Sequence, residues 1–153
     1  MTVSPNTDFI SGAVLTAAEM NKLPRGLMAD VVTSSTTDSS VTAEEVMLTV
    51  TWTAVANRNY RIVYIEPALS GTSTTSATFR LRSGTVTGTV LNSTVVAISS
   101  TLLSFSGFVE SIGSIGAGSQ TVVATLQYSA GTGTATRSAT RVAMLYVEDV
   151  GAT

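Results

Sequence analysis

The 153-residue chain contains neither cysteine nor histidine. Without cysteine it can form no disulfide bond and offers no thiolate ligand to a metal. Without histidine it lacks the commonest general base and metal ligand of proteins. Lys22 is the single lysine and the net charge is −2, so there is no basic surface typical of nucleic-acid binding. We therefore expect a protein that is not an enzyme, with no cofactor, no metal site and no nucleic-acid partner.

Long apolar segments are also missing. No apolar run reaches the length that a membrane span requires, and no charged region followed by an apolar stretch opens the chain as in a secretion signal. We expect no membrane partner and a protein that is made and assembled in a cytoplasm. Only 12% of the residues are charged, whereas 44% are hydrophobic and about thirty per cent are serine or threonine. This composition is typical of β-rich virion or extracellular proteins and supplies enough apolar area for a core.

Short alternating segments dominate the chain after residue 27. The clearest is 46–54, in which apolar residues from Val46 to Ala54 alternate with three threonines, as expected for a strand with one buried face. Trp52 lies on the apolar face, so we interpret it as a core residue. The segment 60–66 is also expected to be a strand, and Pro67 directly after it is expected to end its pairing. The other expected strands are 28–33, 77–82, 89–98, 102–110, 121–128 and 140–150.

About eight such strands with hardly any helix predict an all-β fold, an antiparallel β-sandwich that is jelly-roll-like. Antiparallel pairing is expected because no connection is long enough to contain a crossover helix. We divide the chain into an N-terminal arm, residues 1–26, and a β-sandwich domain, residues 27–153. The segment 33–40 is expected to link the first strand to the sandwich, and 70–76 and 131–136 to form exposed tips.

The arm contains the one expected helix. Thr16 and Glu19 have the spacing of a capping box, which predicts a helix over 17–23 that Pro24 ends. A helix of two turns does not persist alone in water, so it must pack on a surface. That surface is either its own domain or another protein, and we favour attachment to a partner. The residues expected to bind the partner are Phe9, Ile10, Val14, Leu15, Met20 and Leu23.

Two expected strands, 102–110 and 140–150, carry apolar side chains on both faces. A strand that is apolar on both faces is normally covered on both. The arm of the same chain is one possible cover, and a second subunit of a homo-oligomer is the one we favour. The expected subunit-interface residues are Leu102, Phe108, Met144 and Tyr146.

The acidic residues do not suggest catalysis. No two strand carboxylates are brought together by the sequence as a glycosidase requires, and Asp149 lies in no calcium-binding pattern. The glycine-rich segment 113–118 lacks the lysine of a phosphate-binding loop and is interpreted as a turn. We interpret Glu66, Glu110 and Glu148 as solvated strand ends or as partners of Arg61, Arg80 and Arg82.

Two motifs carry a resemblance to a known family. Residues 12–24 read Gly-x-Val-Leu-Thr-Ala-Ala-x-Met-Asn-x-Leu-Pro, and residues 145–151 read Leu-x-Val-Glu-Asp-Val-Gly. The first resembles the N-terminal segment of many small structural proteins of tailed bacteriophages, and the second resembles the close of their β-rich outer domains. The resemblance implies a virion protein such as a head decoration protein, a head fibre or a minor tail protein. It also implies the major capsid protein or another virion protein as partner, a homotrimer, and assembly into the virion in the bacterial host cytoplasm.

Two function classes stay open. The first is a capsid decoration protein that is attached by its arm and stabilises the shell. The second is a receptor- or glycan-binding module of a head fibre, tail fibre or minor tail protein. The absence of a coiled-coil or triple-β-helix shaft is against a long fibre. The expected tips contain serine, threonine and glycine rather than aromatic residues that stack on sugars, which favours the structural role.

Overall fold

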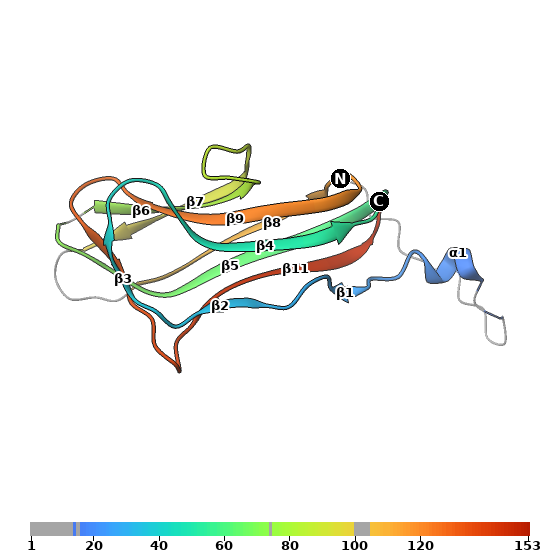
Figure 1. Ribbon diagram of the computed structural model, residues 1–153, viewed down its shortest axis with the longest axis horizontal. Helices are drawn as coiled ribbons and strands as arrows, with labels where there is room; N and C mark the ends of the chain where they lie inside the picture. Colours follow the sequence, from blue (N-terminus) through green and yellow to red (C-terminus); the bar gives the residue numbers. More distant parts are fainter. Residues whose placement is uncertain (1–13, 15, 74, 100–104) are drawn as a thin grey trace.

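The computed structural model describes residues 14, 16–73, 75–99 and 105–153. Two antiparallel sheets of seven and four strands are stacked as a sandwich, and one short helix stands off its end, close to the C-terminus (Figure 1). The expected all-β sandwich is therefore confirmed, with eleven described strands rather than eight. In chain order the elements are α1 Ala17–Met20, β1 Gly26–Leu27, β2 Val32–Ser34, β3 Asp38–Val41, β4 Glu45–Ala54, β5 Arg58–Gly71, β6 Thr75–Ser83, β7 Val90–Ile98, β8 Phe105–Ser114, β9 Gly118–Tyr128, β10 Gly133–Ala135 and β11 Ala143–Ala152.

Strand β5 is the centre of the large sheet. It pairs with β8 along one edge, and with β11 and then β10 along the other. Strands β1 and β2 add to the outer edge of β11, and β3 adds to β10. The small sheet has the order β4-β9-β6-β7. The first and last parts of the described chain therefore lie side by side in one sheet.

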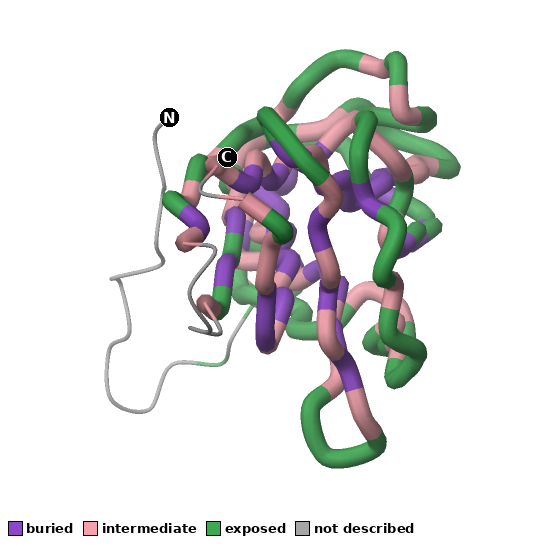
Figure 2. The backbone as a smooth tube through the Cα atoms, turned by 90° about the vertical axis from the view of Figure 1, so that its left-hand side faces the viewer, coloured by how far each residue is buried: buried purple, intermediate pink, exposed green. Residues whose placement is uncertain are grey.

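The hydrophobic core fills the space between the sheets, where Figure 2 shows the buried backbone positions. Strand β4 buries Leu48, Val50, Trp52 and Ala54 as the alternation predicts. Trp52 packs at 5.9 Å from the ring of Tyr60, which confirms it as a core residue. Val46 was expected on the same face but is 44% exposed. The register shifts between Val46 and Leu48, and a bulge of this kind turns the residues before it to the other face.

Several expected boundaries were wrong. The strand expected over 28–33 begins only at Val32, as β2, and a separate short strand, β1, precedes it. Residues 28–31 lie outside any strand, although Met28 packs on the core. Pro67 does not end β5, because the register shift between Glu66 and Leu69 accommodates it and the strand continues to Gly71. The helix was expected over 17–23 but ends at Met20, and residues 21–23 are not helical.

The segment 131–136 is not simply an exposed tip. It contains β10, which joins β3 to β5 and buries Gly133 and Ala135. A side chain at residue 133 would overlap the ring of Tyr128, since its Cβ would lie 2.1 Å from Cε2. Glycine therefore lets β10 pack closely over Tyr128. Of the segment 113–118, which was expected to be a turn, only residues 115–117 lie between strands, and they connect β8 to β9.

Candidate functional site

Helix α1 begins as the sequence predicts. The Thr16 hydroxyl accepts from the backbone N–H of Glu19 at 3.2 Å, and a Glu19 carboxylate oxygen accepts from the backbone N–H of Thr16 at 2.6 Å. The capping box is thus confirmed. These hydrogen bonds from Thr16 lower the pKa of the Glu19 carboxyl. The cap satisfies the first free amides of a helix that has only one turn.

The helix buries none of its residues against the sandwich. Val14 is 88% exposed, Met20 55% and Leu23 36%. The other three arm residues expected to bind a partner, Phe9, Ile10 and Leu15, lie outside the described residues. The side chains of Val14 and Met20 are therefore mostly exposed rather than packed on their own domain, although the sequence left such packing open, and Leu23 is partly covered.

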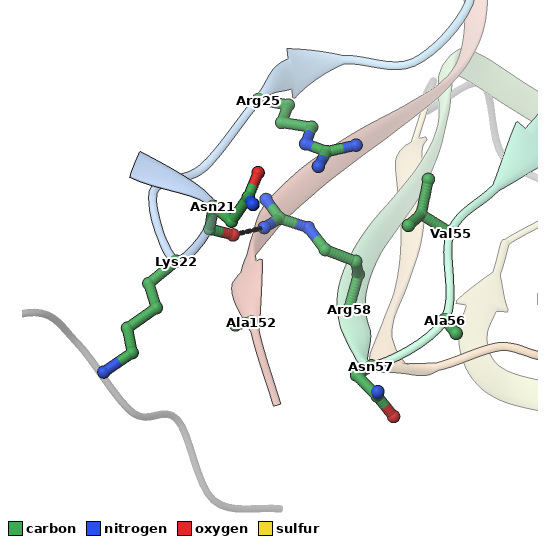
Figure 3. A pocket seen from close by; sticks show the side chains of 8 residues that line it. All are labelled: Asn21, Lys22, Arg25, Val55, Ala56, Asn57, Arg58 and Ala152. Carbon is green, nitrogen blue, oxygen red and sulfur yellow. Dashed lines mark hydrogen bonds between the residues drawn. The ribbon is translucent and has the colours of Figure 1, made fainter. Parts of the chain in front are cut away.

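The arm is held to the sandwich through its backbone. Arg58, at the start of β5, donates from Nη1 to the carbonyl oxygen of Asn21 (Figure 3). Its Nη2 donates to the carbonyl oxygen of Leu23 at 2.6 Å. The same guanidinium pairs with Asp149 of β11, at 2.6 Å from Nε to Oδ2 and 2.5 Å from Nη2 to Oδ1. Neither Arg58 nor Asp149 was a candidate at the level of sequence.

A pocket of about 330 Å³ opens beside this contact. Arg25 extends its guanidinium toward that of Arg58, and Lys22 points away from it (Figure 3). A second pocket of about 360 Å³ shares Ala56 and Asn57 with the first and includes Thr153. Both are open hollows at the arm end of the sandwich. The first is lined by Asn21, Lys22, Arg25, Val55, Ala56, Asn57, Arg58 and Ala152.

The outer face of the large sheet is the second candidate surface. The register places Met144, Ile65 and Phe108 in one row across β11, β5 and β8, and Tyr146, Val63 and Glu110 in the next. Phe108 is 60% exposed, Met144 and Tyr146 are half-buried, and Leu102 lies outside the described residues. Three of the four expected interface residues therefore share one face. We call the apolar residues of the two rows, Met144, Tyr146, Val63, Ile65 and Phe108, the β11-β5-β8 face.

A small ionic network borders the β11-β5-β8 face. Arg61 lies between Glu110 at 3.0 Å and Glu148 at 3.4 Å, and all three side chains are partly exposed. The hydrogen bond and charge of Glu110 raise the pKa of the Arg61 guanidinium. The expectation that Glu110 and Glu148 are partners of a strand arginine is confirmed. An exposed network of this type contributes little to stability.

Glu66 is a correction to the sequence analysis. It is neither a solvated strand end nor a partner of Arg61, Arg80 or Arg82, because it is fully buried and pairs with Arg137 at 2.7 Å. The hydroxyl of Tyr64 donates to Glu66 Oε2 at 2.7 Å. Burial, together with the charge of Glu66, raises the pKa of Tyr64 well above its usual value. This fully bonded pair lies inside the fold and has a structural role.

The outer face of the small sheet differs from that of the large one. Glu44 pairs with Arg82 at 2.6 Å and with Arg80 at 3.0 Å, and it accepts from the hydroxyl of Thr125 at 2.6 Å. The hydrogen bond from Arg82 lowers the pKa of the Glu44 carboxyl. Thr51 lies beside Thr121 on the same face, with 2.9 Å between their hydroxyl oxygens. This face thus presents paired charges and threonines, with the exposed Val46, Val90 and Val95 among them, whereas the exposed aromatic side chain of Phe108 lies on the large sheet.

In the part of the chain that the structure describes, no group of three His, Cys, Asp or Glu side chains is arranged to hold a metal ion. No described helix has the length and apolarity needed to cross a membrane.

Comparison with known proteins gives no match, either to a protein-family model or to a curated protein. The geometry of the arm and of the β11-β5-β8 face therefore carries the functional argument.

Proposed function

We propose that this chain is a structural protein of a bacteriophage virion, a capsid decoration protein that is attached by its N-terminal arm and stabilises the shell. The proposal rests on how the arm is held. Arg58 binds the arm backbone at residues 21 and 23, while the side chains of Val14, Met20 and Leu23 remain exposed. A short segment with fixed backbone and free apolar side chains is suited to docking on another protein. The resemblance of residues 12–24 to phage structural proteins supports the same role.

The energy of such an attachment is modest for each copy. Burying one exposed Val, Leu or Met side chain contributes about 1.5–3 kcal/mol before the costs of association. Ordering free backbone costs about 1–2 kcal/mol per residue, a cost that residues 21–23 have already met because they are held by Arg58. On a symmetric shell the contact is repeated many times, so a weak single contact is sufficient. The partner in this proposal is the major capsid protein or another virion protein.

We also propose that the subunits associate as a homotrimer through the β11-β5-β8 face, and that assembly takes place in the bacterial host cytoplasm. The exposure of Phe108 beside the half-buried Met144 and Tyr146 supports an interface there. Exposed apolar patches bordered by polar groups are typical of protein–protein contacts, and the network around Arg61 forms such a border.

The alternative is a receptor- or glycan-binding head-fibre, tail-fibre or minor tail protein. Trp52 is buried at 4% exposure and cannot stack on a sugar in this fold. Tyr146 and Phe108 are two of the described aromatic side chains near the surface that such a site would use. They lie in the middle of strands rather than on loops, which favours a flat contact with a protein.

The arm is tested by a truncation that removes residues 1–20. It keeps residues 21–27, so the carbonyl groups bound to Arg58 and strand β1 remain. The truncated protein should no longer co-sediment with particles that lack the native subunit, and Met20→Asp should weaken co-sedimentation in part. The matched control is Val95→Asp, which places a charge on an apolar residue of β7 that is 62% exposed. The control should bind as the unmodified protein does.

Undiminished binding of the truncated protein would contradict attachment by the arm and would locate the contact on the sandwich. If the truncated protein still binds particles while those particles lose the ability to bind host cells, the receptor-binding alternative is favoured.

A further inference from the structure

The two motifs at opposite ends of the sequence meet at one side chain. Arg58 contacts the backbone of Asn21 and Leu23 in the first motif and the carboxylate of Asp149 in the second. Strand β1 also pairs with β11, with Gly26 opposite Asp149. The segments that bracket the chain are thus parts of a single junction.

The geometry uses nearly all the hydrogen-bonding capacity of Arg58. A guanidinium has five N–H donors in a fixed planar arrangement. Here Nε and Nη2 bind the two oxygens of Asp149, while Nη1 and Nη2 bind the two arm carbonyl groups. The side chain of Arg58 is 3% exposed and that of Asp149 is fully buried. A buried ion pair requires such complete pairing, because each unpaired charge is costly.

The end of β11 is shaped around the same contact. The backbone N–H of Gly151 donates to Asp149 Oδ1 at 2.9 Å, and the N–H of Ala152 donates to the carbonyl oxygen of Lys22 at 3.4 Å. Gly151 has φ +124°, a conformation that favours glycine. A Cβ at this position would lie 3.3 Å from the carbonyl oxygen of Lys22. Three consecutive arm carbonyl groups, those of residues 21, 22 and 23, are therefore bound by the sandwich.

We propose that Arg58 and Asp149 form a clamp that fixes the arm backbone at residues 21–23 and thereby sets the direction in which α1 projects. They are positioning residues: they hold the arm by its carbonyl groups and leave its side chains available. The clamp acts in the same way whichever protein the arm binds. Its loss releases the arm while the sandwich stays folded.

Two unique residues allow the test. Lys22 is the single lysine, so a lysine-specific endoprotease can cut only at the clamped segment. Trp52 is the single tryptophan and is buried, so its fluorescence reports whether the sandwich is folded. The variant Arg58→Met/Asp149→Asn removes both charges, and the carbonyl oxygen of the introduced amide can still accept from the backbone N–H of Gly151.

In this variant, cleavage after Lys22 should be faster by about tenfold or more, because loss of one hydrogen bond to a charged group corresponds to a factor of that size. The fluorescence of Trp52 should stay that of the folded protein throughout.

The other buried ion pair is the matched control. Arg137 and Glu66 pair at 2.7 Å with side chains 5% and 0% exposed, and neither forms a hydrogen bond with the described residues of the arm. The variant Arg137→Met/Glu66→Gln should change the rate of cleavage after Lys22 by less than about twofold under native conditions, since distant sites behave independently. Equal acceleration by both variants would mean that cleavage follows general loosening of the sandwich, and would overturn the proposal. An unchanged rate in Arg58→Met/Asp149→Asn would overturn it as well.

A milder variant keeps the test usable if the double variant does not fold. Arg58→Lys keeps the charge beside Asp149, but a single ammonium cannot reach both arm carbonyl groups and both carboxylate oxygens. Cleavage after residue 22 should be faster than in the unmodified protein but slower than in the double variant. The masses of the fragments distinguish cleavage after residue 22 from cleavage at the introduced lysine. No acceleration in a folded Arg58→Lys protein would again count against the clamp.

Discussion

Glu66 is an acidic residue whose substitution should lower stability strongly. It is fully buried, and both its carboxylate oxygens bind Arg137, at 2.9 Å and 2.7 Å. Glu66→Gln leaves the guanidinium of Arg137 buried without a counter-charge. Breaking a buried pair in this way costs about 3–5 kcal/mol. We expect a loss of that size in the free energy of unfolding, measured by denaturant titration of Trp52 fluorescence.

The control for Glu66→Gln is Glu148→Gln, which removes one partner of an exposed pair with Arg61 at 3.4 Å. The loss should be below about 1 kcal/mol, as for other surface pairs. Equal losses for the two variants would contradict the structural role assigned to Glu66.

Gly107 of β8 should tolerate no side chain. A Cβ there would lie 2.2 Å from Cζ of Phe79, a ring at the centre of the core. Gly107→Ala must displace that ring, and overpacking of this kind costs about 1–3 kcal/mol. Gly113→Ala in the same strand meets no atom within 4 Å and is the control. Thermal unfolding should show a lower midpoint for Gly107→Ala alone; a midpoint equal to that of Gly113→Ala would contradict the packing.

The alternation of residues along the strands already indicated which charged side chains are buried. Arg58 and Glu66 share the parity of Tyr60, Ile62 and Tyr64, which face the core. Parity alone therefore places two charged residues inward, and buried charges must be paired. The partner of Glu66 could not be found in this way, because Arg137 lies in a connection without periodicity. Asp149 could have been found, since it follows Leu145 and Val147 in the same alternation.

At the scale of elements, the two sheets present different outer faces. The small sheet shows threonine and paired charges together with separate exposed valines, whereas the large sheet shows the β11-β5-β8 face with the exposed ring of Phe108. If this face joins subunits, Phe108→Asp should shift the protein toward monomer. Light scattering should show about three times the chain mass of 15.7 kDa for the unmodified protein and a lower mass for the variant. Tyr146→Asp should act in the same direction.

Thr51→Asp is the control for this prediction, because Thr51 is exposed on the outer face of the small sheet. It should leave the measured mass unchanged. A mass equal to one chain for the unmodified protein at micromolar concentration would reject self-association altogether.

The strands themselves were predictable where alternation is regular and less so where neighbours determine pairing. Strand β4 follows its pattern from Leu48 to Ala54, and only the bulge near Val46 escapes it. Strand β10 has three residues and no apolar pattern, and it exists because β3 and β5 pair with it on both sides. Pairing of this kind depends on neighbouring strands and cannot be predicted from the local sequence. The same holds for the short β1 and β2, which pair with β11 alone.

At the scale of the whole molecule, the arm and the sandwich differ in what holds them. The sandwich has a core between two sheets, whereas helix α1 buries no residue and the arm is held through residues 21–23 and β1. The sequence predicted an arm followed by a sandwich, and it predicted the capping box. It gave no sign of how the arm is joined to the sandwich, because that contact links residues separated by more than thirty positions through one arginine.

Two truncations should separate these contributions to stability. Removal of residues 1–20 deletes a helix without buried side chains and should change the free energy of unfolding by less than about 0.5 kcal/mol, as expected for surface changes. Removal of residues 1–27 also deletes β1 and both carbonyl partners of Arg58. Hydrogen bonds to a charged group contribute about 1.5–3 kcal/mol each, and water can replace part of them once the arm is gone. A loss of about 1–3 kcal/mol is therefore expected for the longer truncation, measured by denaturant titration of Trp52 fluorescence.

Equal stability of the two truncated proteins would mean that the junction holds the arm without contributing to the stability of the fold. A large loss of stability in the shorter truncation would mean that α1 is part of the domain.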